Sequence, residues 1–178
     1  MFLNIITPCS RPKNLNAISN SINIPRENYR WIVVFDALEL PNDIPENCEA
    51  YAIKDPNSTS GNAQRNLAID LVTQGHIYFN DDDTIIQPNL WEEIKDLTND
   101  FISFQQVNND GSLRLEGKII SVGYIDSHNF ITSVECTGNT RWVLNRYDAD
   151  GVFAKDCHDK AKNPIYLPKI LSVYNSLR

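Results

Sequence analysis

An apolar run that stops at three consecutive carboxylates constrains this chain most. Residues 76–79 are short and β-prone and predict a buried strand, and Asp81, Asp82 and Asp83 follow it almost at once. In open α/β sheets, ligands bind at the carboxyl ends of the strands. Adjacent carboxylates repel one another, and a hard divalent cation relieves that repulsion. The run predicts either a Mg²⁺ or Mn²⁺ site or an acidic turn before the next helix.

Two earlier segments repeat the order of an apolar strand followed by polar residues. Residues 31–35 are fully apolar and end at Asp36, and residues 2–7 end at Thr7 and Pro8. Continuous apolar runs are typical of parallel strands that are buried on both faces. If these strands are parallel, their carboxyl ends meet at one edge of the sheet, together with the acidic triplet.

The strongest helical pattern in the chain covers residues 62–73. Its apolar side chains recur every four residues, as in Ala63, Leu67 and Leu71, and Gly75 follows as a stop signal. This helix carries Arg65 in its first turns. After a right-handed crossover that end abuts the same sheet edge, where an arginine suits a diphosphate. The alternative is an ordinary surface arginine.

The remaining segments predict an α/β fold in one domain, residues 1–178. Strand and helix alternate over residues 1–100, which indicates a parallel nucleotide-binding half, and residues 101–178 form a more mixed half. The other predicted elements are helices at 14–22, 88–97 and 152–161, strands at 51–53, 101–107, 113–115, 119–125 and 130–134, and extended segments at 164–168 and 171–174.

Charge and hydropathy exclude two classes of partner. The net charge is −7 and the 16 basic residues are scattered, whereas a nucleic-acid surface needs clustered Lys and Arg. No stretch approaches the roughly 20 apolar residues of a membrane span. Residues 2–6 are too short and lack the basic flank of a signal peptide. We therefore expect a cytoplasmic protein with no membrane span.

Several common site motifs are absent. There is neither a G-x-x-x-x-G-K-[ST] phosphate loop nor a G-x-G-x-x-G fingerprint, which disfavours P-loop enzymes and dinucleotide dehydrogenases. A calcium loop of the EF-hand type fails because Ile85 and Ile86 fall where that loop needs an oxygen ligand and a glycine. The four cysteines are too widely spaced for a disulfide framework, and Cys136, Cys157 and His158 lack zinc-ligand spacing.

Four segments, taken in order, resemble the GT-A glycosyltransferases. They are Thr7-Pro8-Cys9-Ser10-Arg11, Trp31-Ile32-Val33-Val34-Phe35-Asp36, Gly61-Asn62-Ala63-Gln64-Arg65-Asn66 and Tyr78-Phe79-Asn80-Asp81-Asp82-Asp83. The general pattern of these segments is similar to that of the family 2 enzymes, and some of their residues also resemble the family 43 glucuronyltransferases. Residues 37–60 and 105–135 match poorly.

The resemblance implies a role for each residue at the strand ends. Thr7, Pro8 and Arg11 would line the nucleotide pocket, and Asp36 would hydrogen-bond the base. Arg65 would lie near the diphosphate or the donor sugar. The triplet would supply the D-x-D motif, in which Asp83 chelates Mn²⁺ or Mg²⁺, Asp81 contacts the ribose or the metal, and Asp82 contributes to the donor site.

The same resemblance implies a general base in the second half. Family members often carry a late Glu-Asp pair, and Lys155-Asp156 stands in that place, so Asp156 is the candidate base and Glu135 the alternative. His158 is a further candidate ligand for the metal or a phosphate. The alternative for Asp156 and His158 is that both are ordinary surface residues. Trp142 is either a core residue or the floor of the acceptor site.

The implied activity is transfer of a hexosyl group from a nucleotide-sugar, with a UDP-sugar expected first, to the hydroxyl of a saccharide, lipid or protein. We expect a metal-dependent, inverting reaction. Two alternatives stay open. A nucleotidyltransferase normally carries a glycine-rich basic loop after its first strand, and residues 8–14 contain no glycine. A non-catalytic nucleotide- or sugar-binding module would keep the pocket and lose the base.

Overall fold

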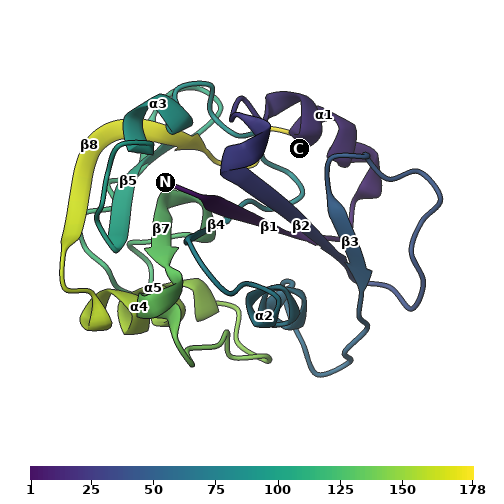
Figure 1. Ribbon diagram of the computed structural model, residues 1–178. Helices are drawn as coiled ribbons and strands as arrows, with labels where there is room; N and C mark the ends of the chain where they lie inside the picture. The colour runs from purple at the N-terminus through teal and green to yellow at the C-terminus, as the bar shows by residue number, and fades with distance from the viewer.

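The computed structural model describes residues 1–178 and is built around one eight-stranded mixed sheet (Figure 1). The order along the sheet is β3-β2-β1-β4-β7-β5-β6, and β8 pairs with β5 off this path. The strands are β1 (Leu3–Cys9), β2 (Tyr29–Phe35), β3 (Glu49–Ala52), β4 (His76–Phe79), β5 (Phe101–Val107), β6 (Leu113–Leu115), β7 (Phe130–Ser133) and β8 (Pro164–Val173).

The first half of the sheet is parallel, as predicted. β1 pairs in parallel with β2 and β4, and β2 pairs in parallel with β3. β7 is antiparallel to both β4 and β5, β6 forms a hairpin with β5, and β8 runs parallel to β5. The carboxyl ends of β1, β2 and β4 therefore meet at one edge.

Helices cover both faces of the sheet (Figure 1). α1 (Leu15–Ser21) and α3 (Leu90–Ile94) lie on one face, and α2 (Asn62–Asp70), α4 (Val134–Thr137) and α5 (Ala149–Lys160) lie on the other. Three 3₁₀ turns complete the chain: η1 (Pro12–Asn14), η2 (Arg26–Asn28) and η3 (Ser127–Asn129). The predicted helices are present, and α5 begins three residues earlier than expected.

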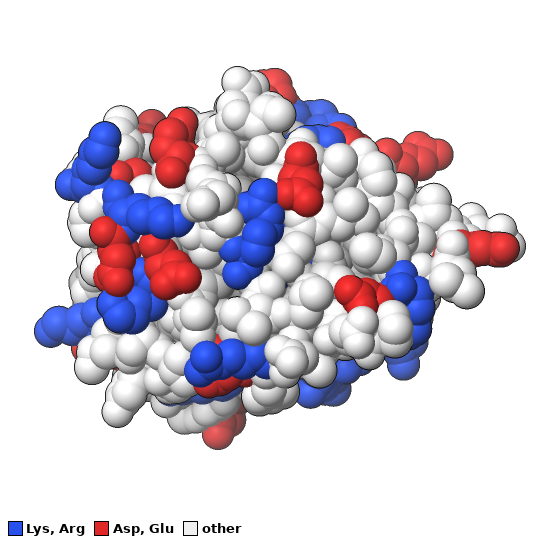
Figure 2. Space-filling view, turned by 90° about the horizontal axis from the view of Figure 1, so that it is seen from below, with Lys and Arg blue, Asp and Glu red and all other residues white.

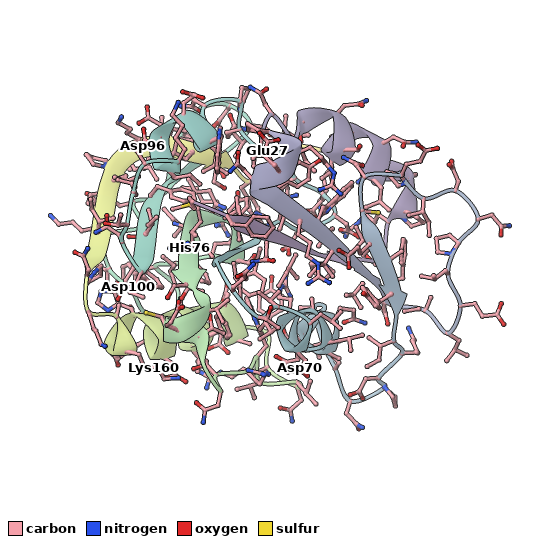
Figure 3. The ribbon with its side chains drawn as sticks, viewed as in Figure 1. Glu27, Asp70, His76, Asp96, Asp100 and Lys160 are labelled. Carbon is pink, nitrogen blue, oxygen red and sulfur yellow. The ribbon has the colours of Figure 1, made fainter.

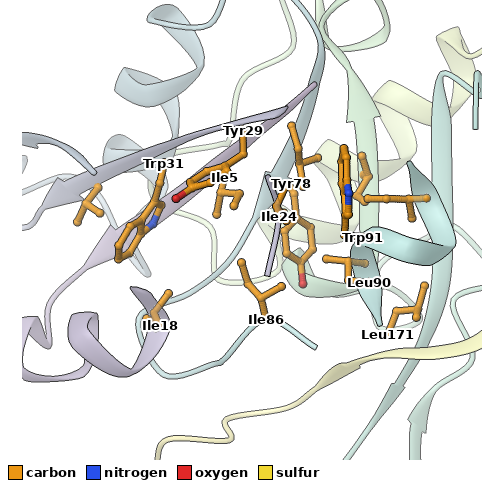
Figure 4. Close-up of a cluster of buried hydrophobic side chains, with 14 of the residues drawn as sticks. Ile5, Ile18, Ile24, Tyr29, Trp31, Tyr78, Ile86, Leu90, Trp91 and Leu171 are labelled. Atoms are coloured by element: carbon orange, nitrogen blue, oxygen red, sulfur yellow. The ribbon is translucent and has the colours of Figure 1, made fainter. Parts of the chain in front are cut away.

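Each face of the sheet has its own buried cluster. Successive strand residues point to opposite faces, so the continuous apolar runs of β1, β2 and β4 supply both clusters. The cluster under α1 and α3 has 19 buried residues, including Trp31 and Tyr78 (Figure 4). The cluster above α2 and α5 has 16, and Phe79, Trp142 and Phe153 form its aromatic centre.

One predicted strand is wrong. Residues 119–125 form no strand, and Ile119, Val122 and Tyr124 are exposed. β5 is already paired along both of its edges, so the segment finds no open strand beside it. Gly117 turns the chain away at φ +73°, where a Cβ would lie 2.2 Å from the Phe104 carbonyl oxygen. The segment therefore runs as a loop.

The surface is mixed in charge. On the face shown in Figure 2, acidic and basic side chains are interspersed and no extended basic patch is present. None of the helices combines the length and apolar character that crossing a bilayer requires.

Candidate functional site

A cavity of about 600 Å³ opens at the carboxyl ends of β1, β2 and β4. It is lined by Pro8, Arg11, Asp36, Arg65 and the acidic triplet, as well as by parts of residues 114–128, 142–150 and 174–178. The prediction that the three strand ends converge is confirmed. Charged residues such as Asp70 and Lys160 on one helical layer, and Glu27 and Asp96 on the other, lie outside it (Figure 3).

Asp82 binds the loop that follows β1. Its Oδ2 accepts hydrogen bonds from the backbone nitrogens of Ser10 at 2.6 Å and Arg11 at 2.7 Å, and from Ser10 Oγ at 3.0 Å. Its Oδ1 lies 2.5 Å from Arg11 Nη1. These contacts engage both oxygens, so Asp82 shapes the cavity wall and holds Arg11 against it.

Asp81 is held from three sides. It forms an ion pair with Arg65 and accepts a hydrogen bond from Ser127 Oγ at 3.2 Å. His128 Nε2 lies 3.0 Å from both the Oδ2 and the backbone nitrogen of Asp81. Burial opposes ionisation of Asp81, but the charges of Arg65 and His128 outweigh it and hold the pKa of Asp81 far below its usual range. Asp81 is therefore a fixed anion.

Asp83 is buried and has two arginine partners. Its Oδ2 lies 2.7 Å from Arg178 Nε and 3.3 Å from Arg11 Nη1. The backbone oxygen of Asp83 also accepts a hydrogen bond from Leu177 at 2.8 Å. The segment that follows β8 thus returns to the triplet and closes one side of the cavity.

The oxygen donors of this site fit a divalent cation that is shared with a phosphate ligand. Asp81 and Asp83 offer hard oxygens to the same cavity. No three His, Cys, Asp or Glu side chains gather closely enough to hold a metal ion alone. Mg²⁺ is commonly bound by one or two carboxylates together with substrate phosphates, and this donor set matches that mode.

Arg65 connects the triplet to the buried cluster between the sheet and helices α2 and α5. Its guanidinium lies 4.5 Å from the ring centroid of Trp142, and its Nη1 donates to the Ser60 carbonyl oxygen. Its buried Nε has no partner. Trp142 packs in the core, as one of the two alternatives for this residue predicted, and it also lines the cavity. The arginine is not a surface residue.

The end of the cavity near β2 is polar. Asp36 lies 3.1 Å from Lys54 Nζ and accepts a hydrogen bond from Gln64 Nε2 at 3.2 Å. Gln64 Nε2 also donates to the Ile53 carbonyl oxygen, which leaves the buried Gln64 Oε1 without a partner. This end therefore offers carboxylate and amide acceptors to a ligand.

Three predicted site residues lie elsewhere. Thr7 is buried inside β1, where its Oγ1 accepts a hydrogen bond from Trp31 Nε1 at 3.0 Å, because the strand continues to Cys9. Asp156 is exposed on α5 and does not line the cavity. The ring of His158 packs edge-on against Phe101 at 5.3 Å, also outside it.

The physical reason for the last two corrections is the face that α5 buries. Phe153, Ala154 and Cys157 point into the core, so Asp156 is turned to solvent. The alternative base, Glu135, is exposed on α4 and is also absent from the cavity lining. The first turn of α5, not its middle, borders the cavity.

Asp150, in that first turn, is a site residue that sequence reasoning missed. It lines the cavity, and burial together with the negative charge of Asp126 raises its pKa to about 6. Its one hydrogen bond is from the backbone nitrogen of Gly151 at 2.7 Å. The available signal was the stretch Asp148-Ala149-Asp150-Gly151, which reads as a polar loop before the apolar face of the helix.

Asp150 differs from the other carboxylates of the cavity in forming no ion pair, although the more distant charge of Arg65 lowers its pKa in part. The ion pairs of the others are Asp36–Lys54, Asp81–Arg65, Asp82–Arg11, Asp83–Arg178, Asp126–Arg114 and Asp148–Arg146. A half-buried carboxylate with a raised pKa and no counter-ion is suited to accept a proton near neutral pH.

Less regular segments form the wall around Asp150. Arg114 lies over the Tyr174 ring at 3.7 Å and pairs with Asp126 at 2.7 Å. Tyr147 is 86% exposed at the rim. Gly151 allows the loop to approach α5, because a Cβ there would lie 2.5 Å from Val122 Cα.

Comparison with known proteins gives a fold and no sequence relative. No protein-family model matches the sequence, and no curated protein matches it. The structure is similar to S. aureus TarS 1–349, with a TM-score of 0.77 and 16% identity over 97% of this chain and 60% of that chain.

Two ligand complexes show the same likeness. S. aureus TarS 1–349 in complex with UDP-GlcNAc has a TM-score of 0.76 and 16% identity over 97% of this chain and 58% of that chain. The mannosyltransferase PcManGT from Pyrobaculum calidifontis, in complex with GDP-Man and Mn²⁺, has a TM-score of 0.67 and 12% identity over 97% of this chain and 56% of that chain. The chain thus spans less than two thirds of these neighbours.

Proposed function

We propose that this chain, whose fold is the GT-A fold of glycosyltransferases, transfers a sugar from a nucleotide diphosphate sugar to an acceptor hydroxyl. The observation that carries the proposal is Asp150, a carboxylate that forms no ion pair and lines the same cavity as the paired Asp81 and Asp83. Neighbours of this fold were solved with UDP-GlcNAc, UDP and GDP-Man, which supports a nucleotide-sugar donor.

The donor would lie along the strand ends. Asp36 and the unpaired Oε1 of Gln64 would accept hydrogen bonds from the base, and a uracil N3–H suits such an acceptor, so a UDP-sugar is the first candidate. Arg11 and Arg65 would face the diphosphate. Pro8 packs against the start of α2, where a Cβ on Gly61 would lie 2.6 Å from Pro8 Cβ, and this contact sets the width of the pocket.

A divalent cation, Mn²⁺ or Mg²⁺, would be held by Asp83 with Asp81 beside it. When bound, such an ion neutralises negative charge that develops on the leaving diphosphate. The PcManGT complex contains Mn²⁺, which supports a divalent ion in this fold. Arg65 and His128 would keep Asp81 ionised and fixed in place.

Asp150 would act as the general base. It would take the proton from the acceptor hydroxyl as that oxygen bonds to the anomeric carbon, while the bond from that carbon to the diphosphate oxygen breaks. A single displacement of this kind inverts the anomeric configuration. The acceptor, a hydroxyl of a saccharide, lipid or protein, would enter past Tyr147 and the loop at Val122.

Calorimetric titration of UDP with and without Mn²⁺, repeated on Asp83→Ala, tests the donor site. We expect tight binding that needs both the metal and Asp83, with GDP, CDP and dTDP as competing nucleotides. A UDP-sugar panel then tests transfer. Release of UDP supports a glycosyltransferase, whereas release of a sugar 1-phosphate, the leaving group of an attack at the α-phosphate, would indicate a nucleotidyltransferase.

Failure in this experiment is equally informative. Binding of UDP without hydrolysis or transfer of any donor would favour a non-catalytic binding module. Absence of metal-dependent binding of all four nucleotides would reduce the triplet to an internally paired acidic turn and would overturn the proposal.

A further inference from the structure

The ion pairs of the triplet are unequal. Arg65 is buried against Asp81, and Arg11 is bonded to Asp82 at 2.5 Å. Arg178, whose side chain is 53% exposed, reaches Asp83 at 2.7 Å. Asp83 is the candidate cation ligand, and its main partner is the most exposed of the three arginines.

The backbone that carries Arg178 is anchored. The backbone nitrogen of Tyr174 donates to the Val107 carbonyl oxygen at 2.8 Å, and the backbone nitrogen of Leu177 donates to the Asp83 carbonyl oxygen at 2.8 Å. Ser176 Oγ accepts a hydrogen bond from the Ile85 nitrogen at 2.9 Å. The segment is therefore fixed beside the cavity, and the long side chain of Arg178 can move without displacing it.

Charge balance decides which partner Arg178 can take. A divalent cation at Asp83 and a guanidinium at the same oxygen repel each other, so the cation must displace Arg178. A diphosphate brings negative charge into the same cavity, and a guanidinium binds phosphate oxygens well in a bidentate manner. Arg65, a second guanidinium in the cavity lining, has a buried Nε without a partner.

We propose that Arg178 is an exchangeable counter-ion of the donor site. It neutralises Asp83 while the cavity holds no donor, and it binds the diphosphate once a cation occupies Asp83. This inference rests on the proposed function, because it requires a diphosphate ligand at the triplet.

The exchange has two opposite consequences for one substitution. Removal of the guanidinium frees Asp83, so Mn²⁺ alone should bind about tenfold more tightly. Removal also takes away a phosphate contact, so UDP at saturating Mn²⁺ should bind about tenfold more weakly. A merely structural role for Arg178 would weaken both interactions or neither.

The experiment compares Arg178→Ala and Arg178→Lys with the unaltered protein and with Arg141→Ala. Arg141 pairs with Asp70 at 2.6 Å on the surface, outside the cavity, so it is a matched control for the loss of an exposed arginine. Mn²⁺ alone is titrated by calorimetry, followed by UDP at saturating Mn²⁺ and by inorganic pyrophosphate as a second probe. Thermal unfolding confirms that each variant is folded.

We expect Arg178→Ala to bind Mn²⁺ more tightly and UDP and pyrophosphate more weakly, and Arg178→Lys to stay near the unaltered protein for Mn²⁺. Equal Mn²⁺ affinity, or no Mn²⁺ binding by any of the proteins, overturns the exchange. So does tighter Mn²⁺ binding with unchanged pyrophosphate affinity. If UDP fails to bind while both the Mn²⁺ and pyrophosphate arms behave as expected, the UDP-sugar donor falls and the exchange stands for a diphosphate of another kind.

Discussion

The two sides of the cavity are built on different principles. The side to which we assign the donor, the donor side, is made of strand ends, and its carboxylates Asp81, Asp82 and Asp83 are each engaged by an arginine. The side to which we assign the acceptor, the acceptor side, is made of a loop and the first turn of α5, and Asp150 there forms no ion pair. The difference indicates that the two sides have separate roles. Paired charges give a fixed binding frame, whereas an unpaired carboxylate keeps a pKa at which it can exchange a proton.

The largest expected effect comes from removing the unpaired carboxylate. Asp150→Asn should lower the rate of transfer by about 10²–10⁴-fold, the usual contribution of a general base, and leave UDP affinity unchanged. In the unaltered protein, kcat/KM should fall below about pH 6, because protonated Asp150 cannot accept a proton. Steady-state rates across pH on a responsive UDP-sugar measure both effects.

Asp156→Asn is the matched control, since Asp156 lies on the same helix outside the cavity. Its rate should equal that of the unaltered protein. A full rate for Asp150→Asn, or a large loss for Asp156→Asn, would reverse the assignment of the base and remove the contrast between the two sides.

The second prediction concerns the core that joins the two sides. Phe153 of α5 packs on Trp142 at 5.0 Å and on Phe79 of β4 at 5.4 Å between ring centroids. Phe153→Ala should lower the free energy of unfolding by about 3–5 kcal/mol. Because this cluster spans residues 1–100 and 101–178, we expect one cooperative transition in urea, as for a single domain.

The exposed Val143 supplies the control for that measurement, since Val143→Ala should change stability by less than about 0.5 kcal/mol. Two separate transitions, with Phe153→Ala shifting just one, would mean that the two halves are independent domains.

The same difference between the two sides explains why the sequence predicted one side of the cavity better than the other. Strands buried on both faces leave an unmistakable apolar run, and parallel pairing then determines where Asp36, Asp81 and Pro8 meet. The position of Arg65 was predictable for the same reason, because the helix that carries it links β3 to β4. The pattern of apolar residues in the sequence thus predicted the fold and most of the residues on the donor side.

The acceptor side left no such pattern. Residues 119–125 resemble a strand locally, but whether they pair depends on edges of β5 that other strands occupy. The predicted helix begins at residue 152 and leaves Asp150 outside it, because helix boundaries are weakly encoded in local sequence. Arg178 reaches Asp83 across 95 residues, a contact that no local pattern reveals.

A smaller effect is expected at the contact that positions the acceptor loop. In Gly151→Ala, the new Cβ would meet Val122 Cα at 2.5 Å and its nitrogen at 2.8 Å, so the loop must move away from α5. We expect a loss of stability of about 1–3 kcal/mol and a raised KM for acceptor, with the affinity for UDP unchanged. Weaker UDP binding in this variant would show that the two sides are not separable.

The last effect is on the pH dependence of stability, and it is no larger than that of Gly151→Ala. The pKa of Asp150 is raised from 3.8 to about 6 in the folded state, so the folded protein binds this proton more tightly than the unfolded chain does. The stability that the protonated group contributes is complete below about pH 3.8 and is lost as pH rises through about 6. Asp150→Asn, which cannot ionise, should gain about 1–3 kcal/mol relative to the unaltered protein between pH 4 and pH 8.

Asp148, two residues earlier, provides a comparison of opposite sign. Its bond to Arg146 lowers the pKa of Asp148, so its ionised form is the one favoured by folding, and that contribution is lost as pH falls. Asp148→Asn should therefore be less stable than the unaltered protein at both pH 4 and pH 8, and this difference should shrink only as pH falls below about 3.8. Urea denaturation of all three proteins at both pH values measures the signs. The same sign for the two variants would mean that Asp150 is paired like its neighbours, and the acceptor side would then differ from the donor side in shape alone.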